Sequence, residues 1–426
     1  MKNVLVFPAG SEIGLEINNA LKYSTHFRVF GLTSVEHHCN YVFSDCFLMP
    51  EFYYHPGFID KLNELIDQHG IDYIYPADDD VQLFLVRNQS LIHAEVVSAD
   101  LFTTEICRAK SKTYQLFAGE DFIPSYYQSV DEIDRYPVFL KPDVGQGSQG
   151  VCKANNAEEA QRAIQDDPNR IICEYLPGEE YTVDCFTDIT GSLVDAQLRN
   201  RKRIRMGISV SSENLPLPED IRRIAQKINE QLHFKGAWFF QIKRDSAGTP
   251  RLMEVAPRIA GTMGLTRNKG TNYPLLTLFT FEGNQVGLIR NRYQIQVDRA
   301  FISRYKTDIR YDTVYVDFDD TLVVRGKVNT FLMMFLYQAK NEGRSVILLS
   351  RHRKDIDQSL RDYHIDRTLF DQILILKPEE KKSDYVTATQ AVFIDDSFAE
   401  RLDVSRTAGI PVFDCSEVEA LVDWRV

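Results

Sequence analysis

Apolar runs and amphipathic helical segments alternate along the start of the chain. Val4–Phe7 is apolar and ends in a Pro-Ala-Gly turn, and the apolar spacing that follows predicts a helix over Glu12–Leu21. A second helix is predicted over Phe58–His69, followed by a strand over Ile71–Tyr75. Strand, glycine turn and helix in this order begin a βαβ unit, so we expect a small open α/β domain over residues 1–100.

The pattern changes at Arg108, after which strands outnumber helices. One long amphipathic segment predicts a helix over Glu219–Leu232. The predicted strands of this region include Ile171–Leu176, Tyr181–Phe186, Trp238–Ile242 and Leu252–Val255. Runs of strands with interspersed helices are typical of an α+β domain, which we place at residues 101–297.

A third segment restarts the α/β alternation with the apolar run Thr313–Phe318. A helix is predicted over Thr330–Gln338, and further strands are predicted near 345–349, 373–376, 391–394 and 411–413. Residues 298–312 are therefore expected to form a linker, and residues 313–426 a compact Rossmann-like α/β domain. The fold class predicted for the whole chain is multidomain, with α/β and α+β parts.

Composition and charge exclude several classes of function. The chain has 426 residues, and its formal net charge of −12 argues against binding to nucleic acid or to an anionic membrane surface. Its seven cysteines form no CxxC pair, so we expect neither a disulfide framework nor a structural zinc site, and a reducing cytosol fits best. No apolar run suits a signal peptide or is long enough to span a bilayer, which predicts a soluble, cytoplasmic protein.

A glycine-rich loop follows an apolar run that ends in Lys141. The loop GQGSQG contains Gly145, Gly147, Ser148 and Gly150, and its glycines would let backbone N–H groups approach a polyphosphate closely. Lys141 would supply a positive charge to the same phosphates. A tight hairpin remains the alternative interpretation of the loop taken alone.

Carboxylates further along the chain favour the nucleotide interpretation. The segment CEYLPGEE places Glu174 and Glu180 on either side of a Pro-Gly turn, where the backbone could read a base and a carboxylate could bind ribose hydroxyls. Gln241 and Glu254 fall on successive predicted strands, and oxygen ligands on adjacent strands suit Mg²⁺. A solvated carboxylate at the end of a strand is the plainer interpretation of Glu254.

With these motifs in this order, residues 1 to about 297 resemble an ATP-grasp protein with its pre-grasp domain. The resemblance implies that ATP and Mg²⁺ are cofactors and that Gln241 and Glu254 hold the magnesium. It implies that Arg258 orients an acyl-phosphate or the acceptor, although an ion-pair partner is the alternative role. The residues that it assigns to ATP binding are Lys112, Lys141, Gly147, Ser148, Glu174, Leu176 and Glu180.

Three positions qualify this resemblance. Lys112 is preferred to Lys110 because its spacing to the following Ile-Pro turn fits the family better. Ala256 stands where the family usually has an asparagine two residues after the metal glutamate, so a second magnesium would be held differently. The basic segment 199–205 is either a solvated face or a group of charges that neutralises the γ-phosphate or an anionic substrate.

A second group of carboxylates follows the apolar run 314–316. Asp317 and Asp319 are two residues apart, so at the end of a strand both would point to the same side, where open α/β sheets bind ligands. One carboxylate could attack phosphorus while the other shuttles the proton of the leaving group. Asp395 and Asp396 follow another apolar run and suit Mg²⁺. An acidic turn after a strand is the alternative interpretation of the first pair.

Residues 313–426 resemble the haloacid dehalogenase (HAD) superfamily. The resemblance implies that Asp317 is a nucleophile, Asp319 an acid and base, and Ser350 a phosphate ligand. It calls for a charge-neutralising lysine, for which Lys382 is preferred and Lys377 is the rival. The segment before the helix at Thr330 leaves no room for a cap domain. The residues that it assigns to magnesium are Asp317, Asp319, Asp395 and Asp396.

The two resemblances together predict a bifunctional enzyme. A ligase would join a carboxylate to an amine through an acyl-phosphate and release ADP and phosphate, and a magnesium-dependent phosphatase would act on a phosphate ester. A carbamoyl- or carboxy-phosphate-forming enzyme is the second enzymatic hypothesis. A nucleotide-binding scaffold in which only the phosphatase is active is the third, motivated by Ala256. The expected partners are small molecules, and a homodimer is left open.

Overall fold

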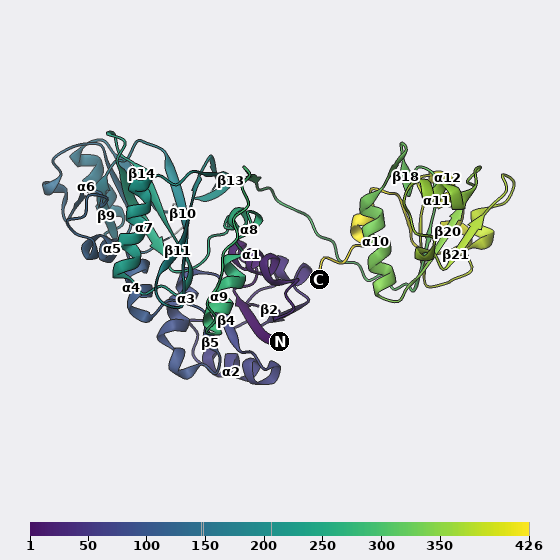
Figure 1. Cartoon of the computed structure of the whole chain (residues 1–426), viewed down its shortest axis with the longest axis horizontal. Coiled ribbons are helices and arrows are strands. Elements are labelled where there is room, and N and C mark those ends of the chain that lie inside the picture. The colour runs from purple at the N-terminus through teal and green to yellow at the C-terminus, as the bar shows by residue number, and fades with distance from the viewer. Residues whose placement is uncertain (146, 148, 206, 426) are drawn as a thin grey trace. The chain divides into compact units, whose positions relative to one another are not determined.

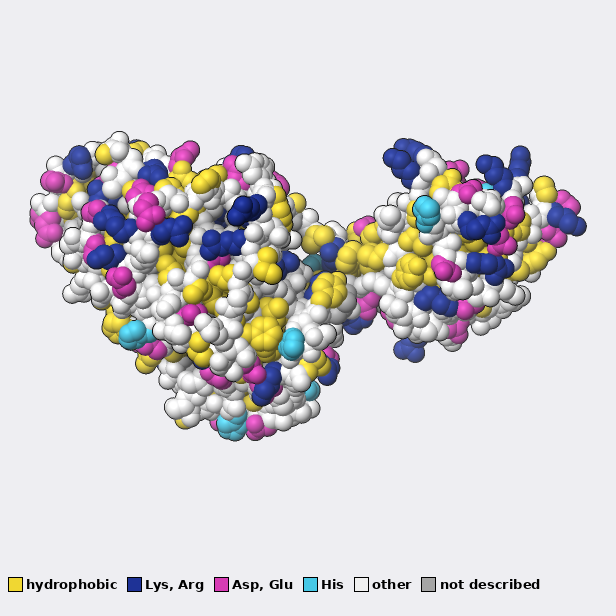
Figure 2. All heavy atoms as spheres, viewed as in Figure 1, with side chains coloured by type: hydrophobic (Ala, Val, Ile, Leu, Met, Phe, Trp, Pro, Cys, Tyr) yellow, Lys and Arg dark blue, Asp and Glu magenta, His cyan; other side chains and the backbone are white. Residues whose placement is uncertain are grey.

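The computed structural model describes residues 1–145, 147, 149–205 and 207–425. Two compact units divide this chain, Met1–Phe301 (unit 1) and Ile302–Arg425 (unit 2) (Figure 1). Within the described ranges, no helix combines the length and the apolar character that crossing a membrane requires. On the face drawn in Figure 2, acidic and basic side chains are interspersed over both units.

Unit 1 begins with a parallel sheet in the order β3-β2-β1-β4-β5. Its strands are β1 (Lys2–Phe7), β2 (Phe27–Thr33), β3 (Asp45–Leu48), β4 (Tyr73–Pro76) and β5 (Glu95–Val96). The helices between them are α1 (Glu12–Leu21), α2 (Phe58–His69) and α3 (Asp79–Arg87). Ser11 begins α1 by accepting a hydrogen bond from the backbone N–H of Gly14, which satisfies one of the free donors of the first turn. The bounds of α1 and α2 are those that the sequence predicted.

A small antiparallel sheet follows, in the order β6-β9-β7-β8. Its strands are β6 (Tyr126–Tyr127), β7 (Val138–Pro142), β8 (Cys152–Ala154) and β9 (Arg170–Glu174). Helices α4 (Leu101–Arg108) and α5 (Lys110–Leu116) precede the sheet in the sequence, and α6 (Ala157–Asp166) connects β8 to β9. Ala160 and Ala163 of α6 pack against Val138 and Leu140 of β7, so the helix covers one face of the sheet.

The largest sheet of unit 1 is antiparallel, with the order β12-β13-β11-β10-β14-β15 and with β16 paired to β13. Helix α7 (Glu219–Gln231) covers strands β10 and β11 (Figure 1), because its apolar residues recur three or four apart and face the sheet. The remaining helices are α8 (Gly264–Asn268) and α9 (Tyr273–Phe281). The strands are β10 (Glu180–Thr187), β11 (Leu193–Asn200), β12 (Arg203–Arg205), β13 (Ile208–Leu215), β14 (Gly236–Arg244), β15 (Pro250–Ala256) and β16 (Gln296–Asp298).

Unit 1 buries its first sheet against its largest sheet. A single hydrophobic cluster contains Val4 and Val6 of β1 together with Phe239 of β14 and Ala256 of β15. The predicted boundary at residue 100 is therefore not a break in packing, because apolar surface of the first sheet is buried by strands that lie far away along the chain.

Unit 2 is a parallel sheet in the order β21-β20-β17-β22-β23. A two-stranded hairpin, β18 (Val323–Val324) and β19 (Lys327–Val328), separates β17 from the first helix. The helices are α10 (Thr330–Asn341), α11 (Ile356–Asp362) and α12 (Phe398–Ala408), and α10 packs along β20 (Figure 1). The sheet strands are β17 (Thr313–Val316), β20 (Ser345–Ser350), β21 (Gln372–Ile375), β22 (Ala391–Ile394) and β23 (Val412–Phe413).

Candidate functional sites

A cavity of about 160 Å³ lies where the two antiparallel sheets of unit 1 meet. The small sheet contributes Lys141 of β7 and Glu174 of β9, and the large sheet contributes Gln241 of β14 and Glu254 of β15. Described residues of the glycine-rich loop line it as well, including Gly147. Ser148, which the sequence assigned to ATP binding, lies outside the described residues.

Lys141 is a buried, charged group in this cavity. Its Nζ donates a hydrogen bond of 2.8 Å to the hydroxyl of Tyr114 and lies 3.4 Å from the carbonyl oxygen of Met253. Burial opposes the charge, but the neighbouring polar groups, Tyr114 first among them and then Cys173 and Glu254, raise the pKa of Lys141 above its ordinary value. Lys141 therefore stays protonated and presents a fixed positive charge to the cavity.

Lys110, and not Lys112, lines the cavity together with Lys141 and Lys243. The Nζ of Lys110 donates to the carbonyl oxygen of Gly145 at 3.1 Å, whereas Lys112 is exposed and lines a different hollow beside Phe102. The prediction of Lys112 is therefore wrong in position. Both residues lie in α5, and two residues along a helix rotate a side chain by about 200°, so the two lysines point to opposite sides.

The hinge between β9 and β10 brings its predicted residues to the same cavity. Glu174, Leu176 and Glu180 all line it. One oxygen of Glu174 accepts the backbone N–H of Ser125 at 2.9 Å, so this carboxylate also ties the hinge to the start of β6. Glu180 lies 3.1 Å from Nε of Arg201, which the sequence left without a settled role.

Gln241 and Glu254 are direct neighbours across strands β14 and β15. Both line the cavity, so an amide oxygen and a carboxylate reach it from the same face of the sheet. Ala256 is buried in the hydrophobic cluster of unit 1 and lies opposite Phe239. The side chain at position 256 therefore offers no oxygen ligand. Of Glu254 and Ala256 in β15, only Glu254 could hold a metal ion.

A second cavity, of about 40 Å³, adjoins the first and shares Lys110, Gly145 and Glu254 with it. Arg258 lines this second cavity and forms a forked ion pair with Asp79 of α3, at 2.7 Å and 2.5 Å. Burial alone would raise the pKa of Asp79, but the charge and hydrogen bonds of Arg258 hold it below its ordinary value. Arg258 is therefore both an ion-pair partner and part of a cavity wall.

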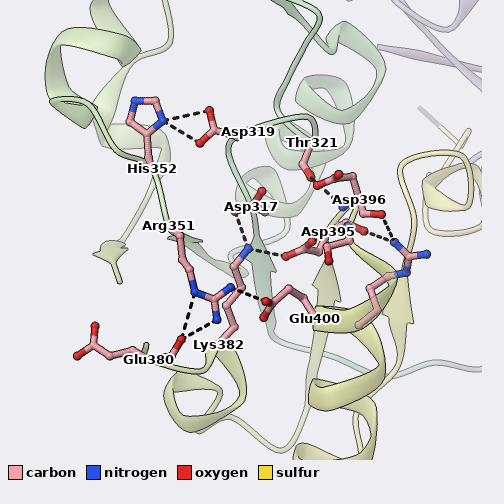
Figure 3. A network of polar contacts seen from close by, with 12 residues as sticks. Asp317, Asp319, Thr321, Arg351, His352, Glu380, Lys382, Asp395, Asp396 and Glu400 are labelled. Carbon is pink, nitrogen blue, oxygen red and sulfur yellow. Dashed lines mark hydrogen bonds and ion pairs between the residues drawn. The ribbon is translucent and has the colours of Figure 1, made fainter. Parts of the chain in front are cut away.

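The candidate site of unit 2 lies at the carboxyl ends of the neighbouring strands β17 and β22. Asp317 follows β17 and Asp395 follows β22, and the ammonium of Lys382 bridges them at 2.6 Å and 2.5 Å (Figure 3). One oxygen each of Asp317, Asp395 and Asp396 lies within 4.8 Å of the others, as a shared metal ion would require. Lys377 is exposed, so Lys382 is the lysine that reaches these carboxylates.

Burial and like charge set the electrostatics of this cluster. Burial raises the pKa of Asp317, and it raises the pKa of Asp395 to about 6, with Lys382 opposing both shifts. Burial opposes the charge of Lys382, but the two carboxylates outweigh it and raise its pKa. Three carboxylates, those of Asp317, Asp395 and Asp396, face one ammonium, and most of the cluster is buried away from water. This excess of negative charge favours a cation between the carboxylates.

Ser350 and Asp319 take different places at this site. Ser350 ends β20 and is buried, and in the described part of the chain its Oγ has no hydrogen-bond partner of good geometry. Asp319 instead turns away from Asp317 and pairs with Nδ1 of His352 at 2.9 Å (Figure 3). The expectation that Asp317 and Asp319 point to one side is wrong here, because β17 ends at Val316 and the chain then leaves the extended conformation.

His352 is a site residue that sequence reasoning missed. It follows β20, and its second ring nitrogen, Nε2, lies 2.8 Å from the hydroxyl of Ser359 in α11. His352 lies two residues after Ser350, at the carboxyl end of a parallel strand. This position could have identified it as a candidate site residue, because open α/β sheets bind ligands there.

A family model and a curated ligase each match part of the chain. Residues 166–300 match a family model described as ATP-grasp in the biosynthetic pathway with Ter operon. A segment of 94 residues, 22% of the chain, is 33% identical to the D-alanine–D-alanine ligase of Fusobacterium nucleatum. That segment spans 33% of the length of the ligase.

Three solved structures share the fold at low sequence identity. The biotin carboxylase domain of Hydrogenobacter thermophilus 2-oxoglutarate carboxylase, bound to MgADP and bicarbonate, is 15% identical with a TM-score of 0.56, over 68% of this chain and 71% of that one. The L-amino acid ligase of Bacillus licheniformis is 15% identical with a TM-score of 0.53, over 66% and 74%. The N5-carboxyaminoimidazole ribonucleotide synthetase of Thermotoga maritima is 16% identical with a TM-score of 0.55, over 74% and 83%.

The biotin carboxylase domain of Hydrogenobacter thermophilus is bound to MgADP, and ATP and Mg²⁺ are the cofactors that the sequence predicted for this chain. The mixed α/β fold also agrees with the predicted class. The family model thus matches residues 166–300, a 94-residue segment is similar to a D-alanine–D-alanine ligase, and the fold is shared with the solved structures named above.

Proposed function

We propose that unit 1 is an ATP-dependent carboxylate–amine ligase. The observation that carries this proposal is the pair of adjoining cavities, which share Lys110, Gly145 and Glu254. A nucleotide in the first cavity would direct its terminal phosphate toward the shared wall. A carboxylate in the second cavity would meet that phosphate there, beside a lysine and a magnesium ligand.

The residues of the first cavity fit Mg-ATP. Lys110 and Lys141 would hold the phosphates, and the backbone N–H groups of Gly145 and Gly147 in the glycine-rich loop would be further donors. Gln241 and Glu254 would hold the magnesium, which supplies charge neutralisation for the triphosphate. Leu176 and Glu174 would flank the adenine, and Glu180 would accept the ribose hydroxyls.

The second cavity suits a carboxylate substrate. Three cations line it, Arg108, Lys110 and Arg258, against the carboxylates of Asp79 and Glu254. Arg108 is ion-paired with Asp80 and Arg258 with Asp79. Lys110 instead donates to backbone carbonyl oxygens of Asp143 and Gly145, so its charge would be the one offered to a bound anion. The carboxylate oxygen would attack the γ-phosphorus and ADP would leave. An amine would then displace phosphate from the resulting acyl-phosphate and form the amide.

The test is product analysis with the full chain, Mg-ATP and a matrix of carboxylates, bicarbonate included, and amines. We expect ADP and phosphate with at least one pair, and Glu254→Gln should abolish turnover. Asp317→Asn, in the other unit, is the matched control and should retain it. Release of AMP and pyrophosphate with every active pair would rule out the acyl-phosphate route. Activity with bicarbonate as the only productive acid would favour the carboxy-phosphate alternative.

We propose a second activity for unit 2, a magnesium-dependent phosphatase of the HAD type. The observation behind it is the buried cluster of Asp317, Asp395 and Lys382, with the hydroxyl of Ser350 nearby. Asp317 would attack phosphorus and take the phosphoryl group as an aspartyl-phosphate, which water then hydrolyses. Asp395 and Asp396 would hold magnesium, and Lys382 and Ser350 would bind the phosphoryl oxygens.

Asp317→Asn should remove hydrolysis of a small aryl phosphate, because an amide cannot serve as the nucleophile. The measurement is phosphate release by the full chain with and without magnesium, and Glu254→Gln serves as the control with its phosphatase site intact. Beryllium fluoride should modify Asp317 alone. An Asp317→Asn protein that hydrolyses the ester at the wild-type rate would refute the assignment.

A further inference from the structure

Two cysteine thiols beside the first sheet of unit 1 lie in direct contact. Cys39 belongs to the short helix η1 (His38–Tyr41), and Cys46 belongs to β3. The thiol of Cys46 donates a hydrogen bond to the sulfur of Cys39, and the two Sγ atoms are 3.0 Å apart. A disulfide bond is about 2.05 Å long, so an approach of about 1 Å would join the two sulfurs.

The segment around Cys39 is held in place by contacts on both sides of it. His37 packs against the turn after β1, where a Cβ on Gly10 would lie 2.3 Å from Nδ1 of the His37 ring. Asn18 of α1 donates a hydrogen bond of 3.1 Å to the carbonyl oxygen of Val42. The sulfur of Cys39 is therefore positioned by the folded chain before any bond to Cys46 forms.

Cys46 is the accessible member of the pair. It is partly exposed on β3, which is the edge strand of the sheet, whereas Cys39 is fully buried. Cys46 pairs in register with Gly31 of β2, and a Cβ on Gly31 would come within 3.0 Å of the Cys46 sulfur. The glycine leaves the room that this sulfur occupies. A small reagent can therefore reach Cys46 but not Cys39.

The hydrogen bond between the two thiols also changes their ionisation. Burial raises the pKa of the Cys107 and Cys185 thiols, which are enclosed in the core. Cys39 is buried as well, yet the hydrogen bond from Cys46 lowers the pKa of Cys39, while donating that bond raises the pKa of Cys46. The pair therefore gives up one proton more readily than a lone buried thiol, and the thiolate is the form that reacts in disulfide exchange.

We propose that Cys39 and Cys46 form a reversible disulfide when the folded chain meets a low-molecular-weight disulfide such as oxidised glutathione. Within the described residues, no third histidine, cysteine or carboxylate lies close enough to share a metal ion with the two sulfurs, which favours a covalent bond between them. In a reducing compartment a bond of this kind is transient and responds to oxidation.

The exchange has two steps. Cys46, its proton passed to Cys39, forms a bond to one sulfur of the small disulfide, whose S–S bond breaks and releases a thiolate. Cys39 then loses its proton to that thiolate and attacks the Cys46 sulfur, which releases the second small thiolate. The two protein sulfurs are oxidised and one small disulfide is reduced, so atoms and electrons balance.

The experiment follows one tryptic peptide of the reduced, folded full chain. Residues 29–61 contain no lysine or arginine before Lys61, so trypsin releases Cys39 and Cys46 together and without any other cysteine. The chain is incubated with oxidised glutathione, then alkylated in denaturant and digested. We expect the peptide to be unalkylated and two hydrogen atoms lighter than its reduced form. Dithiothreitol should restore two alkylated cysteines.

Three variants separate the steps of the exchange. Cys39→Ser should leave Cys46 as a mixed disulfide with glutathione, because the first step remains and the second is lost. Cys46→Ser should leave Cys39 alkylated, since glutathione does not reach the buried thiol. Cys152→Ser is the matched control, because Cys152 is also partly exposed but lies in β8 of another sheet. Its peptide 29–61 should still lose two hydrogen atoms.

Other outcomes would overturn the inference. Alkylation of both cysteines in the wild-type chain, or a separate glutathione adduct on each, would show that no bond forms between them. A bond that forms only when denaturant is present during oxidation would show that the folded chain does not position the sulfurs. The near-ultraviolet circular dichroism of the oxidised chain should match that of the reduced chain, and its loss would assign the bond to unfolded protein. If a serine variant does not fold, the wild-type peptide still decides.

Discussion

The two lysines of helix α5 show how a single side chain decides the charge of a cavity. Lys110 and Lys112 are two residues apart, and sequence spacing alone favoured the second. In the structure Lys110 reaches the carbonyl oxygen of Gly145 in the nucleotide cavity, and burial lowers the pKa of Lys110 there, with Lys141 adding to the shift and Glu254 opposing it. The direction of a helical side chain is set by the helix's packing, which a count of residues does not contain.

We predict that Lys110→Gln lowers ATP turnover by about 100-fold or more, since removal of one preorganised charged contact has an effect of this size on the transition state. Lys112→Gln is the matched control from the same helix, and its turnover should stay within about twofold of wild type because surface substitutions perturb little. Initial rates of ADP release at saturating ATP measure both. The reverse ranking of the two variants would restore Lys112 as the phosphate ligand.

At the site of unit 2, the direction of the Asp319 side chain was likewise not predictable from sequence spacing. Alternation along a strand predicted that it shares a side with Asp317, but the strand ends one residue before Asp317. Asp320 has a φ of 54°, in the left-handed region, so the backbone turns and sends the Asp319 carboxylate to His352. Its proposed role as acid and base requires a rotation toward the phosphoryl group on substrate binding.

At the scale of elements, local patterns predicted several periodic helices and buried strands, but they missed the buried strand β2 and the amphipathic helix α6. The bounds of α1 and α2 agree with the predicted ranges, and α7 ends one residue earlier than predicted. Strands β11, β12 and β13 were not predicted, because their residues are mixed in polarity and two of them carry part of the basic segment. These strands are held by pairing with one another, which is a property of the sheet.

At the scale of the molecule, each unit has hydrophobic clusters of its own. Two clusters contain residues of unit 2 only, among them Val314, Phe335 and Val392 in one and Tyr315 and Phe393 in the other. The break between the units falls between Phe301 and Ile302. A unit that buries its apolar surface within itself does not depend on the rest of the chain for its core.

We therefore predict that residues 302–426, expressed alone, fold cooperatively. Thermal unfolding followed by near-ultraviolet circular dichroism should show one transition, and magnesium should raise its midpoint because a ligand that binds only the folded state stabilises it. Asp395→Asn should fold and lose most of the magnesium effect. A fragment without a cooperative transition would show that unit 2 depends on unit 1.

The sequence by itself determined the classes of the helices and strands that it predicted, the order of the motifs and the identity of several charged residues that line the cavities, among them Lys141, Glu174 and Glu254. These are local properties, because periodicity, glycine placement and carboxylate spacing are written within a few residues of one another. Tertiary structure alone decided that Lys110 faces the nucleotide cavity, that Arg258 pairs with Asp79, and that Asp319 meets His352. Each of these depends on where a side chain points once distant segments pack together, and packing is decided by the whole chain.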